Sequence, residues 1–278
     1  MVSKLIAFGW YGGKYSHLDW LLPLLPMTEN YCEPFGGSAA ILINRTPSMV
    51  ETYNDIDGEV VNFFRVLREK KNELIETIGL TPFSRAEFEL AVNESNNGIS
   101  DVERARRFYI RARQVRTGLA QKASNGRWAH CVLTSRAAMA GAVSRWLGSV
   151  EDLPDIAQRL LRVQIENDSA LKVIKRYDSK NTLFYCDPPY PHECRGDSSA
   201  YKYEMSDKEH RELSKLLHSV EGKVAISSYH CKLMDILYAD WYITEDDERQ
   251  CNSSKGYRVE VLWTNYDPKK EAKSRQIR

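Results

Sequence analysis

The residues most able to do chemistry in this chain are Asp187-Pro188-Pro189-Tyr190, which directly follow the apolar run at residues 183–186. The run is short and bounded by proline, so it predicts a buried strand. The two prolines exclude a helix and stiffen the loop. We therefore expect a carboxylate, backbone carbonyls and an aromatic ring at the carboxyl end of a strand, where open α/β sheets bind ligands. A tight turn after a core strand is the plainer interpretation of the tetrapeptide taken alone.

A second candidate site lies in the run Glu33-Pro34-Phe35-Gly36-Gly37-Ser38. Residues 30–42 predict a strand, a glycine turn and the start of a helix. Missing side chains in such a turn let a nucleotide lie against the helix N-terminus. The glycines do not follow the Gly-x-Gly-x-x-Gly spacing, so a nicotinamide cofactor is not indicated.

An acid follows the glycine turn at a spacing that suits a ribose contact. Residues 50–56 predict a second strand that ends in Asp55, and an acid there can accept hydrogen bonds from both ribose hydroxyls. The neighbouring Ile56 could pack on an adenine face. The turn and the acid together favour a cofactor that contains a nucleoside.

Another glycine loop, Trp10-Tyr11-Gly12-Gly13-Lys14, lies near the start of the chain. Paired glycines let the backbone approach a ligand closely, and the lysine could meet a carboxylate or a phosphate. A plain turn is the alternative.

Positive charge is concentrated in one part of the chain, although the net charge is only +1. Residues 101–150 carry ten Lys and Arg side chains but only two acids, Asp101 and Glu103. One basic block in an otherwise acidic chain is typical of a phosphate-binding segment. A solvated helical face is the alternative, because the arginines from Arg104 to Arg116 have near-helical spacing.

The basic block also contains the pair Asn125-Gly126, which is typical of a hairpin turn. A hairpin with Lys122, Arg127 and Trp128 near its tip could enter a DNA groove. A surface hairpin with a packed tryptophan is the alternative.

Composition predicts a soluble globular protein, with 278 residues of which 28% are charged and 42% hydrophobic. We recognise no signal peptide and no apolar run long enough to span a membrane. The six cysteines form no Cys-x-x-Cys pair. The neighbouring pairs His192/Cys194 and His230/Cys231 lack a second spaced pair, so we expect no metal. Free thiols in a cytosolic protein fit best.

The alternation of expected strands and helices predicts an α/β fold, with a twisted, mostly parallel sheet and helices on both faces. The basic block interrupts this alternation. We therefore expect residues 1–70 and 152–278 to form a catalytic domain. Residues 71–151 would form an inserted, mostly helical recognition domain with a β-hairpin.

Together, and in this order, the motifs resemble the α group of DNA N6-adenine methyltransferases, the Dam-like family. Residues 10–14 resemble its N-terminal motif, residues 33–38 its cofactor loop, and residues 54–57 its ribose-binding acid. Asp187-Pro188-Pro189-Tyr190 is similar to its catalytic tetrapeptide, and residues 260–266 to its final strand. The resemblance covers most of the expected sheet domain and implies a Rossmann-like methyltransferase fold.

The resemblance implies S-adenosylmethionine (SAM) as methyl donor and an adenine flipped out of double-stranded DNA as acceptor. The implied catalytic residues are Asp187, Pro188, Pro189 and Tyr190. The implied cofactor-binding residues are Trp10, Tyr11, Gly12, Gly13, Lys14, Glu33, Pro34, Phe35, Gly37, Ser38, Asp55, Ile56, Asp168, Ser169 and Asp187. The DNA-binding residues expected from the basic block and its hairpin are Arg113, Arg116, Gln121, Lys122, Asn125, Arg127 and Trp128.

The chain departs from the family pattern in two places. Its glycine loop has Ala39 where the family usually has glycine, and a methyl group is tolerable there if φ stays negative. Family members that read GATC usually carry an arginine shortly after a Gly-Leu pair, whereas Gln121 stands here. Arginine suits guanine and glutamine suits adenine, which favours a target other than GATC.

Other classes stay open at this point. One is a catalytically silent DNA-binding protein of the same fold, and another is an RNA adenine methyltransferase. A Rossmann oxidoreductase would need residues for hydride chemistry, and we find none in this chain. Methylation of a protein amide usually goes with Asn in place of Asp187, so the aspartate favours a nucleobase amine. We expect a cytoplasmic protein of bacterial or phage origin with no membrane partner, monomeric or weakly dimeric. The sequence leaves open whether a cognate restriction enzyme accompanies it.

Overall fold

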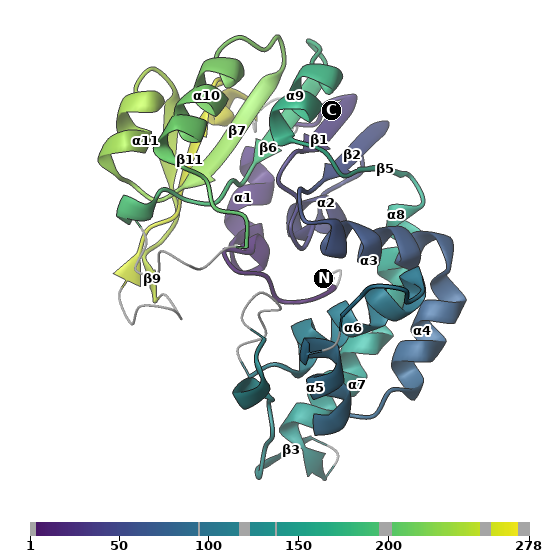
Figure 1. The fold of residues 1–278 in the computed structure, drawn as a ribbon. Coiled ribbons are helices and arrows are strands. Elements are labelled where there is room, and N and C mark those ends of the chain that lie inside the picture. The colour runs from purple at the N-terminus through teal and green to yellow at the C-terminus, as the bar shows by residue number, and fades with distance from the viewer. Residues whose placement is uncertain are drawn as a thin grey trace. The chain divides into compact units, whose positions relative to one another are not determined.

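The computed structural model describes residues 4–93, 95–116, 123–136, 138–194, 202–250 and 257–271. The chain divides into two compact units, drawn in Figure 1. The sheet unit comprises Lys14–Ile56 and Gln164–Arg278, and the helical unit comprises Met1–Gly13 and Asp57–Val163. The helical unit is larger than the expected segment 71–151. That this segment forms a DNA-recognition domain stays a prediction.

The sheet unit is built on a seven-stranded, mostly parallel sheet in the order β5-β2-β1-β6-β7-β11-β8. β1 is parallel to β2 and β6, and β6 is parallel to β7. β11 is antiparallel to both β7 and β8, as a closing pair of strands. The strands are β1 (Asn30–Glu33), β2 (Val50–Asn54), β5 (Val163–Glu166), β6 (Thr182–Cys186), β7 (Lys223–Ser228), β8 (Tyr242–Glu245) and β11 (Val261–Thr264).

The central strand β6 is buried along its whole length, as its apolar run predicts for a strand covered on both faces. Phe184 and Cys186 point to one face, because side chains alternate along a strand. There they pack with residues of α9 (Ala170–Tyr177), α10 (Asp207–Leu217) and α11 (Lys232–Leu237). Figure 1 shows these three helices beside the strands. Tyr185 points to the opposite face and bonds Ser227 of β7.

Short helices complete the sheet unit near its start. Lys14 begins η1 (Lys14–His17), a single 3₁₀ turn that leads directly into α1 (Leu18–Leu24). α2 (Ala40–Asn44) follows the glycine loop after β1 and is buried over four of its five residues. The β1–glycine loop–α2 order therefore agrees with the sequence expectation for residues 30–42.

The helical unit packs around α6 (Asp101–Gln114), which contacts α3, α4, α5 and α7. Aromatic rings fill its centre: Phe63 stacks on Tyr109 with ring centroids 5.4 Å apart, and Phe108 lies 5.0 Å from Phe8. This packing holds residues before Lys14 in the helical unit. The other helices are α3 (Gly58–Glu69), α4 (Lys71–Leu80), α5 (Arg85–Asn93), α7 (Gly141–Glu151) and α8 (Leu153–Leu160).

The pair Asn125-Gly126 does not form the expected two-residue hairpin turn. It lies in η3 (Asn125–Arg127), a 3₁₀ turn closed by a bond from the Arg127 amide to the Ser124 carbonyl. A single antiparallel bridge joins Val115 to Trp128. A two-stranded hairpin in the described part of this unit is formed instead by β3 (Thr134–Arg136) and β4 (Met139–Ala140). Asn-Gly suits both kinds of turn, so the dipeptide alone could not decide between them.

Candidate active site

The two main sequence motifs follow neighbouring strands, β1 and β6. From β1 the order continues to β2 and β5, whereas from β6 it continues to β7. The strand order therefore reverses between β1 and β6. Open α/β sheets bind ligands outside the carboxyl ends of their strands at such a switch point. The glycine loop leaves the end of β1 and Asp187 leaves the end of β6, so both motifs flank this point.

The glycine loop packs closely against Tyr53 of β2. A Cβ atom on Gly36 would lie only 2.2 Å from the Tyr53 ring. The Tyr53 hydroxyl donates to the Gly37 carbonyl at 2.8 Å, and Gly37 has a φ of +47°. The loop therefore needs one glycine for space and the next for backbone conformation.

Asn54 ties together the ends of β1, β2 and β5. Its side-chain amide donates to the Pro34 carbonyl at 2.8 Å and to the Asp168 carbonyl at 3.1 Å. Its oxygen accepts from the Asp168 amide at 2.9 Å. Asn54 is a structural residue of the site that does not belong to the expected set. The signal for it in the sequence is an amide side chain at a strand end, where a buried amide must find partners.

The predicted nucleoside-binding residues lie along this edge. Asp55 accepts a bond from the Gly37 amide at 2.8 Å, so the acid and the glycine loop are joined. Ile56 is 49% exposed, so its apolar side chain is accessible at this edge. Asp168 accepts from the Ser169 amide at 2.7 Å and pairs with Lys172 and Arg176 of α9. These residues lie along one edge of the sheet, and their contact with a cofactor stays a prediction.

Ala39 does not have the negative φ that we expected for an alanine in the glycine loop. Its φ is +55°, in the left-handed region, and not negative. An alanine in this region costs about 1–2 kcal/mol. The residue precedes α2 and is fully buried, so the surrounding loop imposes the conformation. The chain therefore keeps the loop shape despite the missing glycine, at the cost of local backbone strain.

A cluster of charged side chains surrounds Asp187. The Lys14 ammonium lies 2.7 and 2.8 Å from the two Asp187 oxygens and 3.4 Å from a Glu260 oxygen. The Ser227 hydroxyl donates to Asp187 at 3.0 Å, and the Tyr190 hydroxyl donates to Glu260. Lys14, Glu260 and Tyr190 are each 3% exposed. The expected role of Lys14 in a cofactor site stays a prediction; within the sheet unit its ammonium pairs with the Asp187 and Glu260 carboxylates.

Burial dominates the electrostatics of this cluster. Burial raises the pKa of Glu260 to about 7, although Lys14 acts in the opposite direction. Burial also lowers the pKa of Lys14, but Asp187 and Glu260 together outweigh it and leave that pKa raised. Lys14 therefore stays charged at neutral pH, whereas Glu260 gains or loses its proton there.

Tyr190 is enclosed within the sheet unit. Its ring makes an edge contact with Tyr229 at 5.0 Å, and the Lys14 ammonium lies 4.9 Å from the ring centroid. Burial raises the pKa of its hydroxyl, which stays protonated and can donate to Glu260. Stacking of this ring on a base stays a prediction, and it requires one ring face to be uncovered.

Other residues expected near the cofactor have structural partners. Glu33 is buried and accepts from the Tyr31 hydroxyl at 2.6 Å, and burial raises its pKa to about 8. Phe35 packs against the core under α9 and α10. Ser38 is buried. The carbonyl of Ser169 accepts hydrogen bonds from the amides of Lys172 and Val173 in the first turn of α9.

The N-terminal loop forms a turn, with the Gly13 amide bonded to the Trp10 carbonyl and Gly12 at a φ of +70°. Trp10 packs on Phe8 and Phe108 of the helical unit. Residues 10–13 therefore belong by packing to that unit, whereas Lys14 belongs to the sheet unit. Tyr11 is half-buried.

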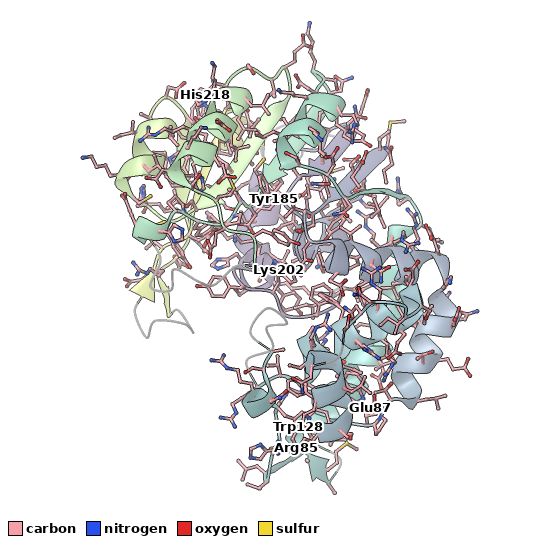
Figure 2. All side chains as sticks on the ribbon, in the orientation of Figure 1. Arg85, Glu87, Trp128, Tyr185, Lys202 and His218 are labelled. Carbon is pink, nitrogen blue, oxygen red and sulfur yellow. The ribbon has the colours of Figure 1, made fainter. Side chains whose placement is uncertain are left out.

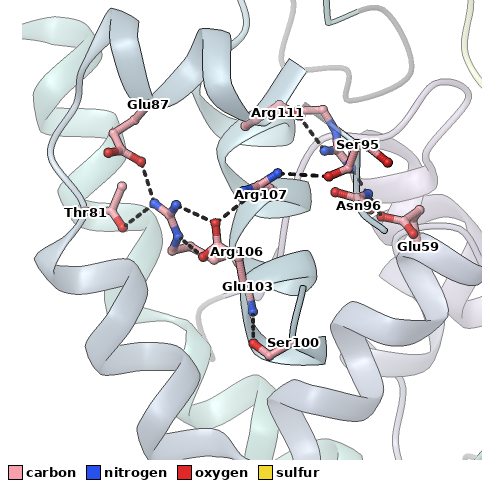
Figure 3. A network of polar contacts seen from close by, with 11 residues as sticks. Glu59, Thr81, Glu87, Ser95, Asn96, Ser100, Glu103, Arg106, Arg107 and Arg111 are labelled. Carbon is pink, nitrogen blue, oxygen red and sulfur yellow. Dashed lines mark hydrogen bonds and ion pairs between the residues drawn. The ribbon is translucent and has the colours of Figure 1, made fainter. Parts of the chain in front are cut away.

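The arginines of α6 are not the free phosphate-binding face that the basic block predicts. Arg106 bonds Glu87 of α5 at 2.6 Å and Glu103 at 2.7 Å, as Figure 3 shows. Arg111 reaches Glu59 of α3, which also pairs with Arg104. The neutralising acids Glu59 and Glu87 lie outside residues 101–150, so a count within that window misses them. These arginines hold helices together.

The expected DNA-binding residues fall into three groups. Gln121 and Lys122 lie outside the described residues. Arg113 and Trp128 have structural partners: Arg113 donates to the Ile6 carbonyl, and Trp128 packs on Phe83 with Arg85 4.8 Å above its ring (Figure 2). Trp128 is therefore packed against its neighbours, as in the alternative interpretation of this segment. The exposed residues of the expected set are Arg116, Asn125 and Arg127.

Residues 10–251 match the family of D12 class N6 adenine-specific DNA methyltransferases. The chain belongs to this family. It is also 26% identical to the type II methyltransferase M1.LlaDCHI of Lactococcus lactis subsp. cremoris, over 92% of this chain and 94% of that protein. The glycine loop after β1 and Asp187 after β6 both lie within the matched region. The chain is therefore an adenine-N6 DNA methyltransferase with a Rossmann-like sheet.

No described helix is long and apolar enough to cross a membrane. Within the same residues, no three His, Cys, Asp or Glu side chains gather in a way that could hold a metal ion.

The close approach of Gly36 to Tyr53 makes a testable prediction. In Gly36→Ala the new methyl group collides with a fully buried ring, so we expect the methyltransferase to lose about 1–3 kcal/mol of unfolding free energy. Gly79→Ala is the matched control, because nothing lies within 4 Å of its Cβ position and alanine favours helix. Urea denaturation measures both, and equal stabilities for the two variants would contradict the packing argument.

The buried Glu33 carboxyl predicts a pH dependence of stability. Its pKa is higher in the folded protein, about 8, than the ordinary 4.5, so the folded state holds the proton more tightly. Stability from this group is lost as pH rises from about 4.5 through 8. Glu33→Gln has no proton to lose, so its Tm should fall less than that of the wild type between pH 5.5 and 8.5. The exposed Glu29→Gln serves as control, and parallel Tm curves for E33Q and wild type would refute the expectation.

Proposed function

We propose that this adenine-N6 DNA methyltransferase uses SAM as its donor and methylates an adenine flipped out of double-stranded DNA. The observation that carries the proposal is the placement of Asp187 across the strand-order switch point from the glycine loop. A donor held by the loop and an amine held by Asp187 would meet at one sheet edge. The family supplies the reaction, and the proposal assigns its parts to residues.

The donor is assigned to the edge formed by β1, β2 and β5. The glycine loop leads from β1 to the start of α2, Asp55 suits the ribose hydroxyls, and Ile56 suits an adenine face. Asp168, held by Asn54, would accept from the donor's adenine amine. When bound, SAM supplies a methyl group on a positively charged sulfur. A net negative cluster at Asp187 and Glu260 suits a cation.

The acceptor amine is assigned to Asp187 and the Pro188 carbonyl. The lone pair of adenine N6 is delocalised into the ring, so this amine is a poor nucleophile. Two acceptors on its hydrogens favour a more tetrahedral nitrogen and stabilise the positive charge that develops as the methyl group arrives. No strong base is needed, because the methylated ammonium readily releases a proton. Tyr190 would stack on the extruded base and offset part of a flipping cost of a few kcal/mol.

DNA contacts are assigned to exposed residues near the end of α6. Arg116 and Arg127 are bound to each other through their backbones, and Asn125 lies beside them. They suit phosphate and base contacts better than the paired arginines within α6. Gln121 is proposed to contact adenine, which favours a target other than GATC.

The cellular setting is proposed from the relative. M1.LlaDCHI is named a type II methyltransferase. We infer that the present enzyme protects DNA beside a cognate restriction enzyme. It would act as a monomer or weak dimer in the cytoplasm, where bacterial or phage DNA is found.

Asp187→Ala tests the catalytic assignment. We expect the variant to keep SAM binding and to lose roughly 10²–10³ in methyl-transfer rate, because a preorganised acceptor is removed. Transfer of labelled methyl groups to DNA measures the rate, and calorimetry measures SAM binding. The surface variant Asp240→Ala, whose side chain is 71% exposed, is the matched control. Wild-type turnover in Asp187→Ala would end the assignment.

The target is found by incubating the wild type with SAM and unmethylated genomic DNA, then mapping N6-methyladenine by single-molecule sequencing. We expect one methylated motif that is not GATC. A GATC motif would refute the role given to Gln121. Binding of SAM without DNA methylation would instead argue against double-stranded DNA as the unaided substrate.

A further inference from the structure

Asp187 is engaged by the donors Lys14 and Ser227 in this structure. Both of its oxygens lie within 2.8 Å of the Lys14 ammonium, and the Ser227 hydroxyl bonds one of them. An ionised carboxylate has about four acceptor positions, so a position on Asp187 stays open for an amine hydrogen. The Lys14 ammonium nevertheless neutralises the negative charge that strengthens such a bond. Asp187 therefore accepts an adenine hydrogen more strongly if Lys14 weakens its hold when adenine arrives.

Glu260 offers Lys14 a second acceptor at short range. The Lys14 ammonium already lies 3.4 Å from a Glu260 oxygen, so a small shift of a flexible side chain moves it from one carboxylate to the other. Both carboxylates are held in place from their strands: Asp187 follows β6, and Glu260 directly precedes β11. The Glu260 carbonyl also accepts from the Asp246 amide at 2.9 Å.

The helix that carries Lys14 is anchored independently. His17, three residues on in η1, bonds Asp246 at 2.6 Å. Asp246 is the backbone partner of Glu260. The backbone at Lys14 is thus fixed beside Glu260, and only the lysine side chain has to move.

Burying the charged form of Glu260 costs free energy unless partners compensate it. The cluster holds one ammonium and two carboxylates, and Lys14 and Glu260 are each 3% exposed. An unpaired buried carboxylate is strongly unfavourable. The Tyr190 hydroxyl offsets part of this cost by donating to Glu260. The same bond connects Glu260 to the aromatic residue of the catalytic tetrapeptide.

We propose that Glu260 is a positioning residue that receives the Lys14 ammonium from Asp187 when the adenine amine binds, while holding Tyr190 through its hydroxyl. The inference rests on the proposed function of Asp187. The exchange breaks and forms ion pairs only, and no covalent bond changes. It requires an ionised Glu260.

This requirement gives a pH signature. The titratable groups facing Glu260 are Lys14 from η1, Asp187 and Tyr190 from the loop after β6, and Tyr185 from β6. Burial raises the Glu260 pKa to about 7, so kcat/KM should rise with pH across this value as the proton leaves. Among the described residues of the sheet unit, Glu33 also has a carboxyl whose pKa burial raises, to about 8, and it is unchanged in a Glu260 variant.

The test compares Glu260→Gln with wild type over pH 6–9, with SAM and DNA carrying the mapped motif. Glutamine can still accept from Tyr190 but carries no charge. We expect kcat/KM at pH 8 to fall roughly ten- to hundredfold, since contacting charged groups couple strongly, and the rise near pH 7 to disappear. Glu260→Asp keeps the charge and should keep that rise. Glu245→Gln, an exposed carboxylate paired in register with Val261, is the matched control.

A double-mutant cycle with Lys14→Met completes the test. In Lys14→Met no ammonium can move between the two carboxylates. Glu260→Gln should therefore change kcat/KM for methyl transfer less than about threefold in that background. A retained pH 7 rise in Glu260→Gln, or an equal penalty with and without Lys14, would overturn the inference. The proposed function fails separately, if the wild type itself transfers no methyl group from SAM to DNA.

Discussion

A buried ammonium group on Lys14 must be neutralised within the sheet unit, and much of the site follows from that constraint. Its partners are Asp187 and Glu260, which come from loops beside β6 and β11. An unpaired charge in this place would be far more costly than the ion pairs that replace it. The same attraction that stabilises the folded state also occupies the carboxylate assigned to catalysis. Stability and reactivity are therefore in direct competition at Asp187.

The edge that we propose for the donor depends on a different kind of interaction. Asn54 bonds backbone groups after β1 and β5, and Asp55 bonds the glycine loop. These neutral and charge-assisted hydrogen bonds hold three strand ends together before any ligand binds. Preorganisation of this sort lowers the entropy cost of binding. The strained Ala39 shows that the loop shape is enforced by its surroundings.

In the helical unit, arginines of α6 form ion pairs that stabilise the packing of the helices. Glu59, Glu87 and Glu103 engage four arginines of α6, and the stacked rings of Phe63 and Tyr109 fill the space between helices. Among the described residues that follow α6, Arg116 and Arg127 are exposed, and their contact with DNA stays a prediction. Partly buried pairs are screened less by salt than exposed ones, so these helix contacts should persist at moderate ionic strength.

The sequence by itself determined the family, the α/β class and the strand-end positions of Asp187, Asp55 and the glycine loop. These features are local: short apolar runs, glycines and prolines act over a few residues, so their meaning survives without tertiary information. The order of the motifs along the chain then gave the reaction class. The exposed Ile56 and the bond between Asp55 and Gly37 agree with that interpretation.

Only the tertiary structure decided how side chains far apart in sequence are paired. Lys14, Asp187 and Glu260 meet because β6 and β11 both pair with β7, and no local pattern encodes that contact. The arginines of α6 looked free because their partners Glu59 and Glu87 belong to other helices. The positive φ of Ala39 and the 3₁₀ turn at Asn125 likewise depend on what surrounds them. The sequence therefore shows which residues can form ion pairs or turns, whereas tertiary packing determines which partners and which turns they form.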